Sequence, residues 1–425
     1  MIPVLLLLCV LFSILTWTEQ YPTGASAARQ FARLLTSDGS PHLAVLIVVR
    51  DGEEDAAFAD TLRQELLSRK AIVVGVVRGQ PIDARKVIAA HLAAGEKIDV
   101  IAANEVTAAW GLFDHLGESF PALANVRIVK PAPYHWPNFL KTENLLNIAN
   151  QIAVIAIIAI GMTMVIITGG IDLSVGSLIA LSSVVSAYLI RGFGGARDAS
   201  TLAMIACCLA GLLTCAFTGL FTGTMVTLFR VPSFIVTLAI MLIASGLAYR
   251  ISDSQSINQV PDRFVWLGRG ANLGGIPNAV ALMLLLYAAA HVLMSRTAVG
   301  RYIYAVGGNA EAARLSGVPI RRVLLFVYCV SGALAGLGGV IMASLLKSGA
   351  PTYGQMYELY VIAAVVVGGT SLAGGQGKIF GTLVGALIIA VIQNGMNLCG
   401  VESNNQKIVL GGVILGAVLL DQIRK

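Results

Sequence analysis

The sequence predicts an α-helical protein that crosses a membrane about ten times and also carries a small α/β domain. Three observations support this fold class. Hydrophobic residues make up 56% of the 425 residues and charged residues only 12%, which is too apolar for an ordinary soluble domain. From residue 144 onward, apolar segments long enough to span a bilayer follow one another. By contrast, residues 21–141 carry 13 Lys and Arg and 13 Asp and Glu, half of all charges in the chain.

The first apolar segment, residues 1–18, reads MIPVLLLLCVLFSILTWT and is long enough to cross most of a bilayer. We predict that it is a first transmembrane helix or uncleaved signal anchor. A cleaved signal peptide stays open as the alternative, because Ala25-Ser26-Ala27 offers a small-residue cleavage site. A signal peptide normally has a cation before its apolar run, and none is present here, which argues against a cleaved signal peptide. Both interpretations place the following residues outside the cytoplasm.

Residues 20–135 are predicted to form the α/β domain. Apolar strand-like runs alternate with polar stretches of helical period, and the runs lie at 42–49, 71–77, 98–102 and 126–129. Connections of this length join parallel strands through crossover helices, so a four-stranded parallel sheet is expected. Neither a G-x-G-x-x-G nor a phosphate-loop motif occurs in it. Its order of elements resembles one lobe of the periplasmic sugar-binding proteins, and a purely structural or docking domain is an equal alternative.

Nine further segments are candidate transmembrane helices. They are 145–168, 173–190, 201–229, 232–249, 275–295, 323–346, 357–373, 379–398 and 405–421. If the amino terminus is cytoplasmic, the loop 296–322 is cytoplasmic as well. That loop contains five arginines and one acid, which agrees with the excess of cations in cytoplasmic loops. The charge pattern therefore favours ten spans with both termini in the cytoplasm.

The stretch TGGIDLSVGS, residues 168–177, interrupts the apolar sequence with glycines, Asp172 and Ser174. Within a bilayer, such a break is stable only where neighbouring helices or a water-filled path shelter the backbone. One interpretation makes Asp172 and Ser174 part of a polar substrate pathway. The other makes the stretch a turn between two spans, with Asp172 or Ser174 capping the next helix. The residues alone leave both open.

Other polar residues inside predicted spans are candidates for the same pathway. Glu358 lies near the outer end of its span, and Gln393, Asn394 and Asn397 lie within 379–398. Amides and carboxylates hydrogen-bond the hydroxyl groups of sugars, so these side chains could contact such a cargo. The alternative is that the amides bond between helices, as intramembrane amides commonly do.

ITGGIDLSVGSLIAL (167–181) closely resembles the permease subunits of ribose-type ABC sugar importers. The resemblance continues through RVPSFIVTLA (230–239), GRYIYAVGGNAEAARLSGV (300–318) and the block YELYVIAAVVVGGTSLAGGQGKIFGTLVGALI (357–388), and it covers residues 138–425. It implies an ABC-importer permease domain over that range, with the α/β domain inserted after the first span. The family does not usually have such a domain. A pentose, a hexose or a similar polyol is the cargo that the resemblance implies.

The stretch GGNAEAARLSGV, 307–318, is predicted to contain a short helix from Ala310 to Ser316, which Gly317 ends and Pro319 cannot continue. A loop helix held at the headgroups by its arginines is one interpretation. The resemblance implies the other, a coupling helix that contacts a separate ATPase. Its expected contact residues are Gly308, Asn309, Glu311, Ala312, Ala313, Arg314 and Gly317.

An ATPase partner is also expected because the chain has no nucleotide-binding motif of its own. Gly374-Gly375-Gln376-Gly377-Lys378 looks like a phosphate loop, but Ile379 stands where Ser or Thr is required. We therefore expect no catalytic residue, no cofactor and no metal. The expected partners are ABC ATPase subunits, a periplasmic sugar-binding protein, a second copy of the chain, the sugar and the lipid bilayer, and not nucleic acid.

The expected location is the inner membrane of a bacterial cell, with residues 20–135 on the periplasmic side. Two other functions remain possible on the sequence. A self-contained secondary transporter would couple transport to ions through Asp172 and Glu358. A membrane-anchored sensor would bind its ligand with the α/β domain.

Overall fold

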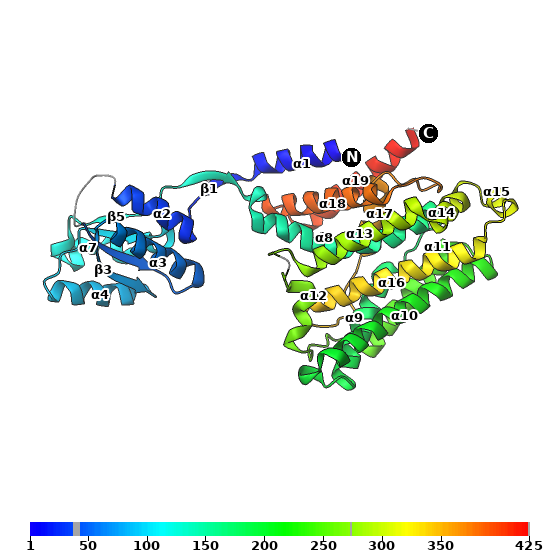
Figure 1. The fold of residues 1–425 in the computed structure, drawn as a ribbon, viewed down its shortest axis with the longest axis horizontal. Coiled ribbons are helices and arrows are strands. Elements are labelled where there is room, and N and C mark those ends of the chain that lie inside the picture. Colours follow the sequence, from blue (N-terminus) through cyan, green and yellow to red (C-terminus); the bar gives the residue numbers. More distant parts are fainter. Residues whose placement is uncertain (37–42, 273, 424–425) are drawn as a thin grey trace. The chain divides into compact units, whose positions relative to one another are not determined.

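The computed structural model describes residues 1–36, 43–272 and 274–423 and divides them into two units (Figure 1). The helical unit comprises Met1–Thr16 and Asn138–Lys425, and the α/β unit comprises Trp17–Pro137. The boundaries thus lie a few residues outside the expected 20 and 135.

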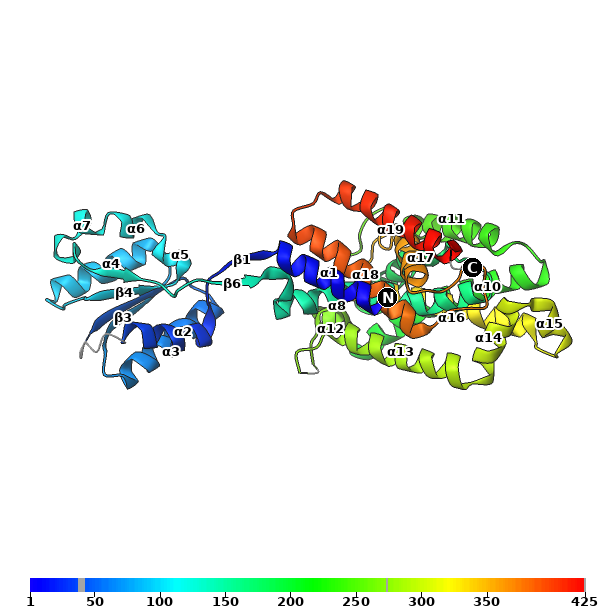
Figure 2. The same ribbon diagram turned by 90° about the horizontal axis from the view of Figure 1, so that it is seen from above.

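The α/β unit is built on a parallel sheet with the strand order β3-β2-β4-β5. Its strands are β2 (Ala44–Val49), β3 (Ile72–Arg78), β4 (Val100–Ala103) and β5 (Arg127–Val129). Strand β2 is buried on both faces, because Val45 and Ile47 pack on one side while Leu46 and Val48 pack on the other. Helices α2 (Gly24–Leu35) and α3 (Glu53–Ser68) cover the first face, and α4 (Pro81–Ala93) with the short α5–α7 (105–119) covers the second (Figure 2).

Two further strands were not expected from the sequence. β1 (Trp17–Gln20) pairs antiparallel with β6 (Tyr134–Pro137), so both ends of the α/β unit leave it side by side. The first helix, α1, consequently spans Ile2–Leu15 and is shorter than the predicted 1–18. Trp17 is in a strand because it pairs with Pro137, which is distant in the sequence. The apolar residues before Trp17 gave no sign of this pairing, so the sequence predicted a longer helix.

Seven helices in the described part of the chain are long and apolar enough to cross a membrane. They are α8 (Thr142–Ile167), α9 (Val175–Gly192), α10 (Thr201–Leu228), α11 (Ser233–Ile251), α13 (Asn278–Arg296), α16 (Ile320–Leu346) and α18 (Ile379–Leu398). The apolar helices α1 and α17 (Tyr357–Val367) are shorter. The remaining elements of the unit include α12 (Trp266–Arg269), α14 (Ala298–Gly308), α15 (Ala310–Leu315) and α19 (Ser403–Ile423).

Helix α8 lies at the centre of the helical unit and is almost entirely buried. Around it pack α13, α16, α17 and α18, while α9 and α10 pack on α16 (Figure 1). Glycines allow the close approach of α10 and α16: a Cβ at Gly219 would lie 2.2 Å from the Tyr328 carbonyl oxygen. Small residues at helix contacts are the usual means of packing in a bilayer.

The predicted span 357–373 is too long by six residues, because helix α17 ends at Val367 and residues 368–378 form a loop. Gly368 and Gly369 lie at that end, and Gly369 adopts φ +87°, a conformation that stops a helix. With 11 residues, α17 is about 16 Å long, roughly half of a bilayer's apolar thickness. It is a half-length helix, and it packs against α8 and α18.

Candidate functional site

The break at residues 168–174 is a tight loop between α8 and α9, in which Asp172 and Ser174 are buried. Gly169 adopts φ +81°, and the amide of Gly170 returns to the carbonyl of Val165, which closes the end of α8. Asp172 is only 2% exposed and Ser174, the residue before α9, is 1% exposed. One carboxylate oxygen of Asp172 accepts hydrogen bonds from the Ser174 amide (3.0 Å) and hydroxyl (2.6 Å).

Two other helices hold this loop in place. From α16, the Ser331 hydroxyl donates to the second carboxylate oxygen of Asp172 at 2.8 Å. From α11, Ser233 accepts a hydrogen bond from the Ile171 amide, and Thr237 donates to the Ile171 carbonyl. Asp172 therefore joins the start of α9 to α16, and a buried carboxylate with three donors is well satisfied.

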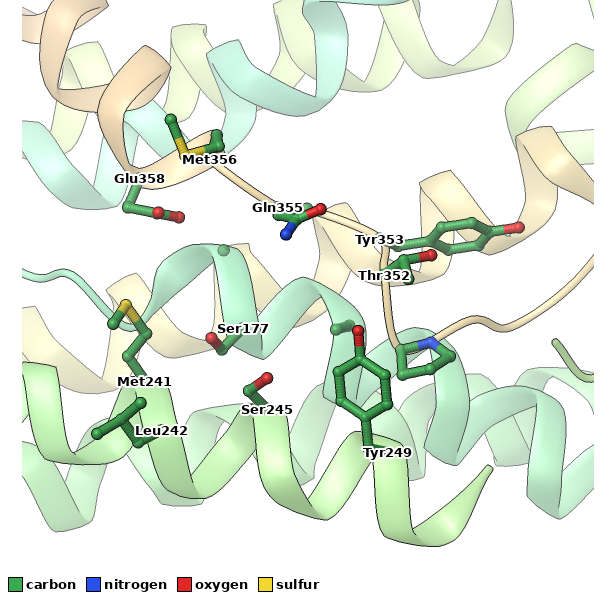
Figure 3. A pocket seen from close by; sticks show the side chains of 14 residues that line it. Ser177, Met241, Leu242, Ser245, Tyr249, Thr352, Tyr353, Gln355, Met356 and Glu358 are labelled. Atoms are coloured by element: carbon green, nitrogen blue, oxygen red, sulfur yellow. The ribbon is translucent and has the colours of Figure 1, made fainter. Parts of the chain in front are cut away.

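A cavity of about 270 Å³ opens beside the first turn of α9 (Figure 3). It lies between α9, α11, the segment 351–356 and the first turn of α17. Its lining combines hydroxyl, amide and carboxylate groups with apolar side chains: Ser177, Ser245, Tyr249, Thr352, Tyr353, Gln355 and Glu358, together with Met241, Leu242 and Met356. Its volume and mixed lining suit a small molecule that carries several hydroxyl groups.

Glu358 is the predicted residue that the structure places at this cavity. Its carboxylate lies directly over the backbone of Gly176, where an added Cβ would be 2.2 Å from Oε2 of Glu358 and 2.6 Å from the Gly354 carbonyl oxygen. Gly176 is in the first turn of α9, the positive end of that helix, which favours a nearby carboxylate. The first turns of α9 and α17 thus meet at one wall of the cavity.

The other predicted pathway residues lie elsewhere. Gln393 and Asn397 line a separate cavity of about 250 Å³ with Gln151, Tyr357 and Tyr360. Asn394 instead forms two reciprocal hydrogen bonds with Asn144 of α8, at 2.8 and 3.0 Å, and so joins two helices. Asp172 and Ser174 line neither of these two cavities.

The predicted helix in the loop 307–318 is confirmed as α15, Ala310–Leu315. Asn309 caps its start, because its side chain accepts a hydrogen bond from the Ala312 amide at 2.9 Å. Gly317 ends it with φ +81°. Arg314 Nε donates to Glu311 at 3.0 Å, and this bond holds the pKa of Glu311 below its ordinary value.

The surface of α15 differs from the expected one at two residues. Ala313 is buried at 5% exposure, so it packs inward and does not face a partner, whereas Gly308, Asn309, Glu311, Ala312, Arg314 and Gly317 are exposed. Leu315, which was not singled out from the sequence, is 75% exposed at the end of the helix. Because it adjoins the exposed residues of α15 that were expected to contact a partner, Leu315 is a candidate for the same contact.

Sequence reasoning also missed most of the cavity lining. Ser245 and Tyr249 are four residues apart and so share one face of α11, a signal that the sequence contained. The segment 351–356 carried no such signal, because its position depends on contacts with distant residues, such as the pairing of Ile257 with Gly349 and the packing of Gly354 on α9.

Comparison with known proteins gives consistent results. A model of the family described as "Branched-chain amino acid transport system / permease component" matches residues 144–418. "Ribose import permease protein RbsC" of Escherichia coli strain K12 is 46% identical over 289 residues, which cover 67% of this chain and 87% of the relative. The protein with the same description from Bacillus subtilis strain 168 is 45% identical over 67% of this chain and 87% of its own length. "D-allose transport system permease protein AlsC" of Escherichia coli strain K12 is 36% identical over 67% and 85%. No solved structure matches.

Proposed function

The chain belongs to this family of transport-system permease components, and from that membership we infer that it is the membrane-spanning permease subunit of an ABC sugar importer. Its part is to form the passage through the inner membrane, while ATP is hydrolysed by a separate ATPase. The description of the family names branched-chain amino acids, whereas the relatives described above import ribose and allose. We therefore propose a pentose, a hexose or a similar polyol as the cargo.

The observation that carries the proposal is the cavity between α9, α11 and α17. Its hydroxyl and amide groups can donate and accept hydrogen bonds, as a sugar requires, and Glu358 accepts from sugar hydroxyls. We assign the cargo contacts to this cavity and to Glu358 first. Gln393 and Asn397 form a second polar surface for the passage, and Asp172 and Ser174 hold the α8–α9 loop that leads into α9, whose first turn lines the first cavity.

We assign the ATPase contact to α15. The helix presents the Glu311–Arg314 pair and the apolar Leu315 to solvent, and it lies within the loop 296–322, for which the charge pattern favours the cytoplasmic side. Two such permease subunits with two ATPase subunits are the assembly that we propose, together with a sugar-binding protein that delivers the cargo. We propose that the half-length α17 crosses the membrane together with its flanking segments 351–356 and 368–378. On that count α1, the seven long helices, α17 and α19 make ten spans, with both ends in the cytoplasm.

This topology places the α/β unit on the periplasmic side, with α1 retained as its first anchor. Phe12 of α1 is 7% exposed and packs against Phe139 and over Gly395 of α18. The main-chain carbonyl and the hydroxyl of Thr16 accept hydrogen bonds from the amides of Asn138 and Phe139. The possible cleavage site at Ala25-Ser26-Ala27 lies inside α2, and Ala27 is only 2% exposed. These contacts support an uncleaved first span.

Reconstitution tests the proposal. The chain is co-purified with a candidate ATPase and inserted into liposomes, and uptake of labelled ribose is measured with ATP and with or without the sugar-binding protein. We expect uptake that requires ATP and is stimulated by the binding protein. Uptake by the chain alone, driven by an ion gradient, would contradict the proposal and indicate a secondary transporter.

Amide variants of Asp172 and Glu358 sharpen this distinction. In an ion-coupled transporter, the double variant Asp172→Asn with Glu358→Gln loses all uptake, because no titratable carboxylate remains. In an ATP-driven permease, we expect the double variant to retain a measurable fraction of uptake, since an amide still hydrogen-bonds both the loop and the sugar. Complete loss in a variant that still assembles with the ATPase would count against the proposal.

A further inference from the structure

Three segments of the helical unit meet through their main chains at one point, which we call the glycine junction. It consists of Gly307 at the end of α14, Gly374 and Gly375 in the loop 368–378, and Ile167, the last residue of α8. The Gly375 amide donates a hydrogen bond to the Ile167 carbonyl at 2.8 Å. An ideal Cβ at Gly307 would lie 1.6 Å from that carbonyl oxygen and 2.7 Å from the Gly375 nitrogen.

The glycines of the junction are required by both space and conformation. Gly374 and Gly375 have φ of +86° and +72°, and a Cβ on Gly375 would lie 2.9 Å from the Cα of Gly308. Tyr304 of α14 adds a hydrogen bond across the junction, from its hydroxyl to the Gly377 carbonyl at 2.8 Å. The close approaches between the glycines and Ile167 are made by main-chain atoms, so they cannot be relieved by a change of side-chain rotamer.

The junction lies between the proposed ATPase contact and the proposed cargo cavity. On one side, Gly307 precedes Asn309, the cap of α15, by two residues. On the other side, Ile167 is followed by the α8–α9 loop, in which Asp172 is bonded to α16. That loop leads directly into the first turn of α9, where Gly176 and Ser177 line the cavity. A displacement of α15 can therefore reach the cavity wall through a short series of packed main-chain contacts.

One buried group at the junction lacks a partner in this arrangement. Thr370 is 1% exposed, and its hydroxyl oxygen has no hydrogen bond partner in the part of the chain that the structure describes. A Cβ at Gly377 would lie 2.7 Å from that oxygen. A buried hydroxyl without a partner is unfavourable, so an alternative arrangement of the loop 368–378 that supplies one gains that hydrogen bond.

We propose that the glycine junction positions the α8–α9 loop according to the position of α15, and that it thereby links ATP hydrolysis on the partner to opening of the cargo cavity. Gly307, Gly375 and Tyr304 are positioning residues in this scheme and contact neither nucleotide nor sugar. The inference rests on the proposed function, because it requires a partner ATPase that moves α15. Contact alone does not establish energetic coupling, so the test measures coupling.

The test compares uptake and ATP hydrolysis by the reconstituted complex, measured as sugar molecules transported per ATP. Gly307→Ala requires the junction to open by about 2 Å, from 1.6 Å to an ordinary contact of 3.4 Å. We expect hydrolysis to stay within about twofold of the unmodified complex and the transport ratio to fall about tenfold. Tyr304→Phe removes one hydrogen bond without added volume, and we expect a fall of about threefold.

Gly246→Ala is the matched control. Gly246 lies within α11, and a Cβ there meets no atom within 4 Å, so the same chemical change is made where there is space. We expect this variant to keep both the hydrolysis rate and the transport ratio. Thermal unfolding of all three complexes, followed by size-exclusion chromatography, separates loss of coupling from loss of assembly.

The transport ratios of the junction variants decide whether the glycine junction couples α15 to the cavity. A reduced ratio in both junction variants, at an unchanged unfolding temperature for Tyr304→Phe, supports the proposal. If Gly307→Ala does not assemble, Tyr304→Phe decides alone. An unchanged ratio in every junction variant that assembles overturns it. Failure of the proposed function is distinguishable, because the unmodified complex would then transport no sugar.

Discussion

At the scale of single residues, Asp172 has one hydrogen-bond partner that the sequence could indicate and one that it could not. The sequence left open whether it lines a pathway or caps a helix. In the structure, its two oxygens accept from Ser174 and from Ser331, 159 positions away in the chain. The first partner was predictable, because it lies two residues away. The second was not, since no local pattern indicates which serine of which helix will be its neighbour.

This arrangement predicts a graded loss of stability at Asp172. Asp172→Ala leaves the Ser174 amide and hydroxyl and the Ser331 hydroxyl without their acceptor, and we expect it to lower the free energy of unfolding by about 3 kcal/mol. Asp172→Asn retains an acceptor of the same shape, and we expect a loss of about 1 kcal/mol. Denaturant unfolding in mixed micelles measures both.

Two serine variants complete the series. Ser331→Ala removes one donor to Asp172 and is expected to cost about 1 kcal/mol. Ser295→Ala is the control, because the Ser295 hydroxyl is exposed and bonds only to the His291 carbonyl of its own helix. Equal stability of Asp172→Ala and Ser295→Ala would show that the loop is not held by this carboxylate.

At the scale of elements, α15 illustrates what local sequence determines well. A helix from Ala310 to Ser316 that Gly317 ends was predicted from propensity and spacing alone, and the structure has it one residue shorter, as Ala310–Leu315. Which side of the helix faces outward depends on packing against α14 and α16, and so the burial of Ala313 and the exposure of Leu315 required the structure. Helix α17 shows the opposite case, because its apolar sequence continues past the point at which the helix ends.

The exposed end of α15 predicts a defect in partner binding. Leu315→Ser removes an exposed apolar contact, so we expect weaker association with the ATPase, by about tenfold in the dissociation constant. We expect no change in the unfolding temperature of the isolated permease, because the side chain is 75% exposed. Surface plasmon resonance with the permease in nanodiscs measures the affinity, and an unchanged value would exclude Leu315 from the contact.

At the scale of the whole molecule, the chain contains two stretches of different composition, one rich in charged residues and one apolar. The charged stretch forms a four-stranded parallel sheet covered on both faces by helices, and the apolar stretch forms a helical unit with a buried central helix. The proposed topology places the α/β unit and α15 on opposite sides of the membrane. This arrangement is a proposal that chemical labelling can test.

Two introduced cysteines make that test. Ser68→Cys lies at the exposed end of α3 and Leu315→Cys at the exposed end of α15. In intact cells whose outer membrane has been permeabilised, we expect a membrane-impermeant maleimide to label the first variant and not the second. The unmodified chain gives the background, because its six cysteines all lie outside residues 17–137. Labelling of Leu315→Cys but not of Ser68→Cys would invert the topology.

The sequence by itself determined the class of the protein, most of its helices, the four parallel strands and the resemblance to sugar permeases. These follow from composition, period and short motifs, all of which are local. Only the tertiary structure decided which polar groups meet: Glu358 over Gly176, Asn394 with Asn144, Asp172 with Ser331, and Gly307 against Ile167. Contacts between helices depend on the three-dimensional fit of residues more than 100 positions apart, and periodicity within one helix carries no information about that fit.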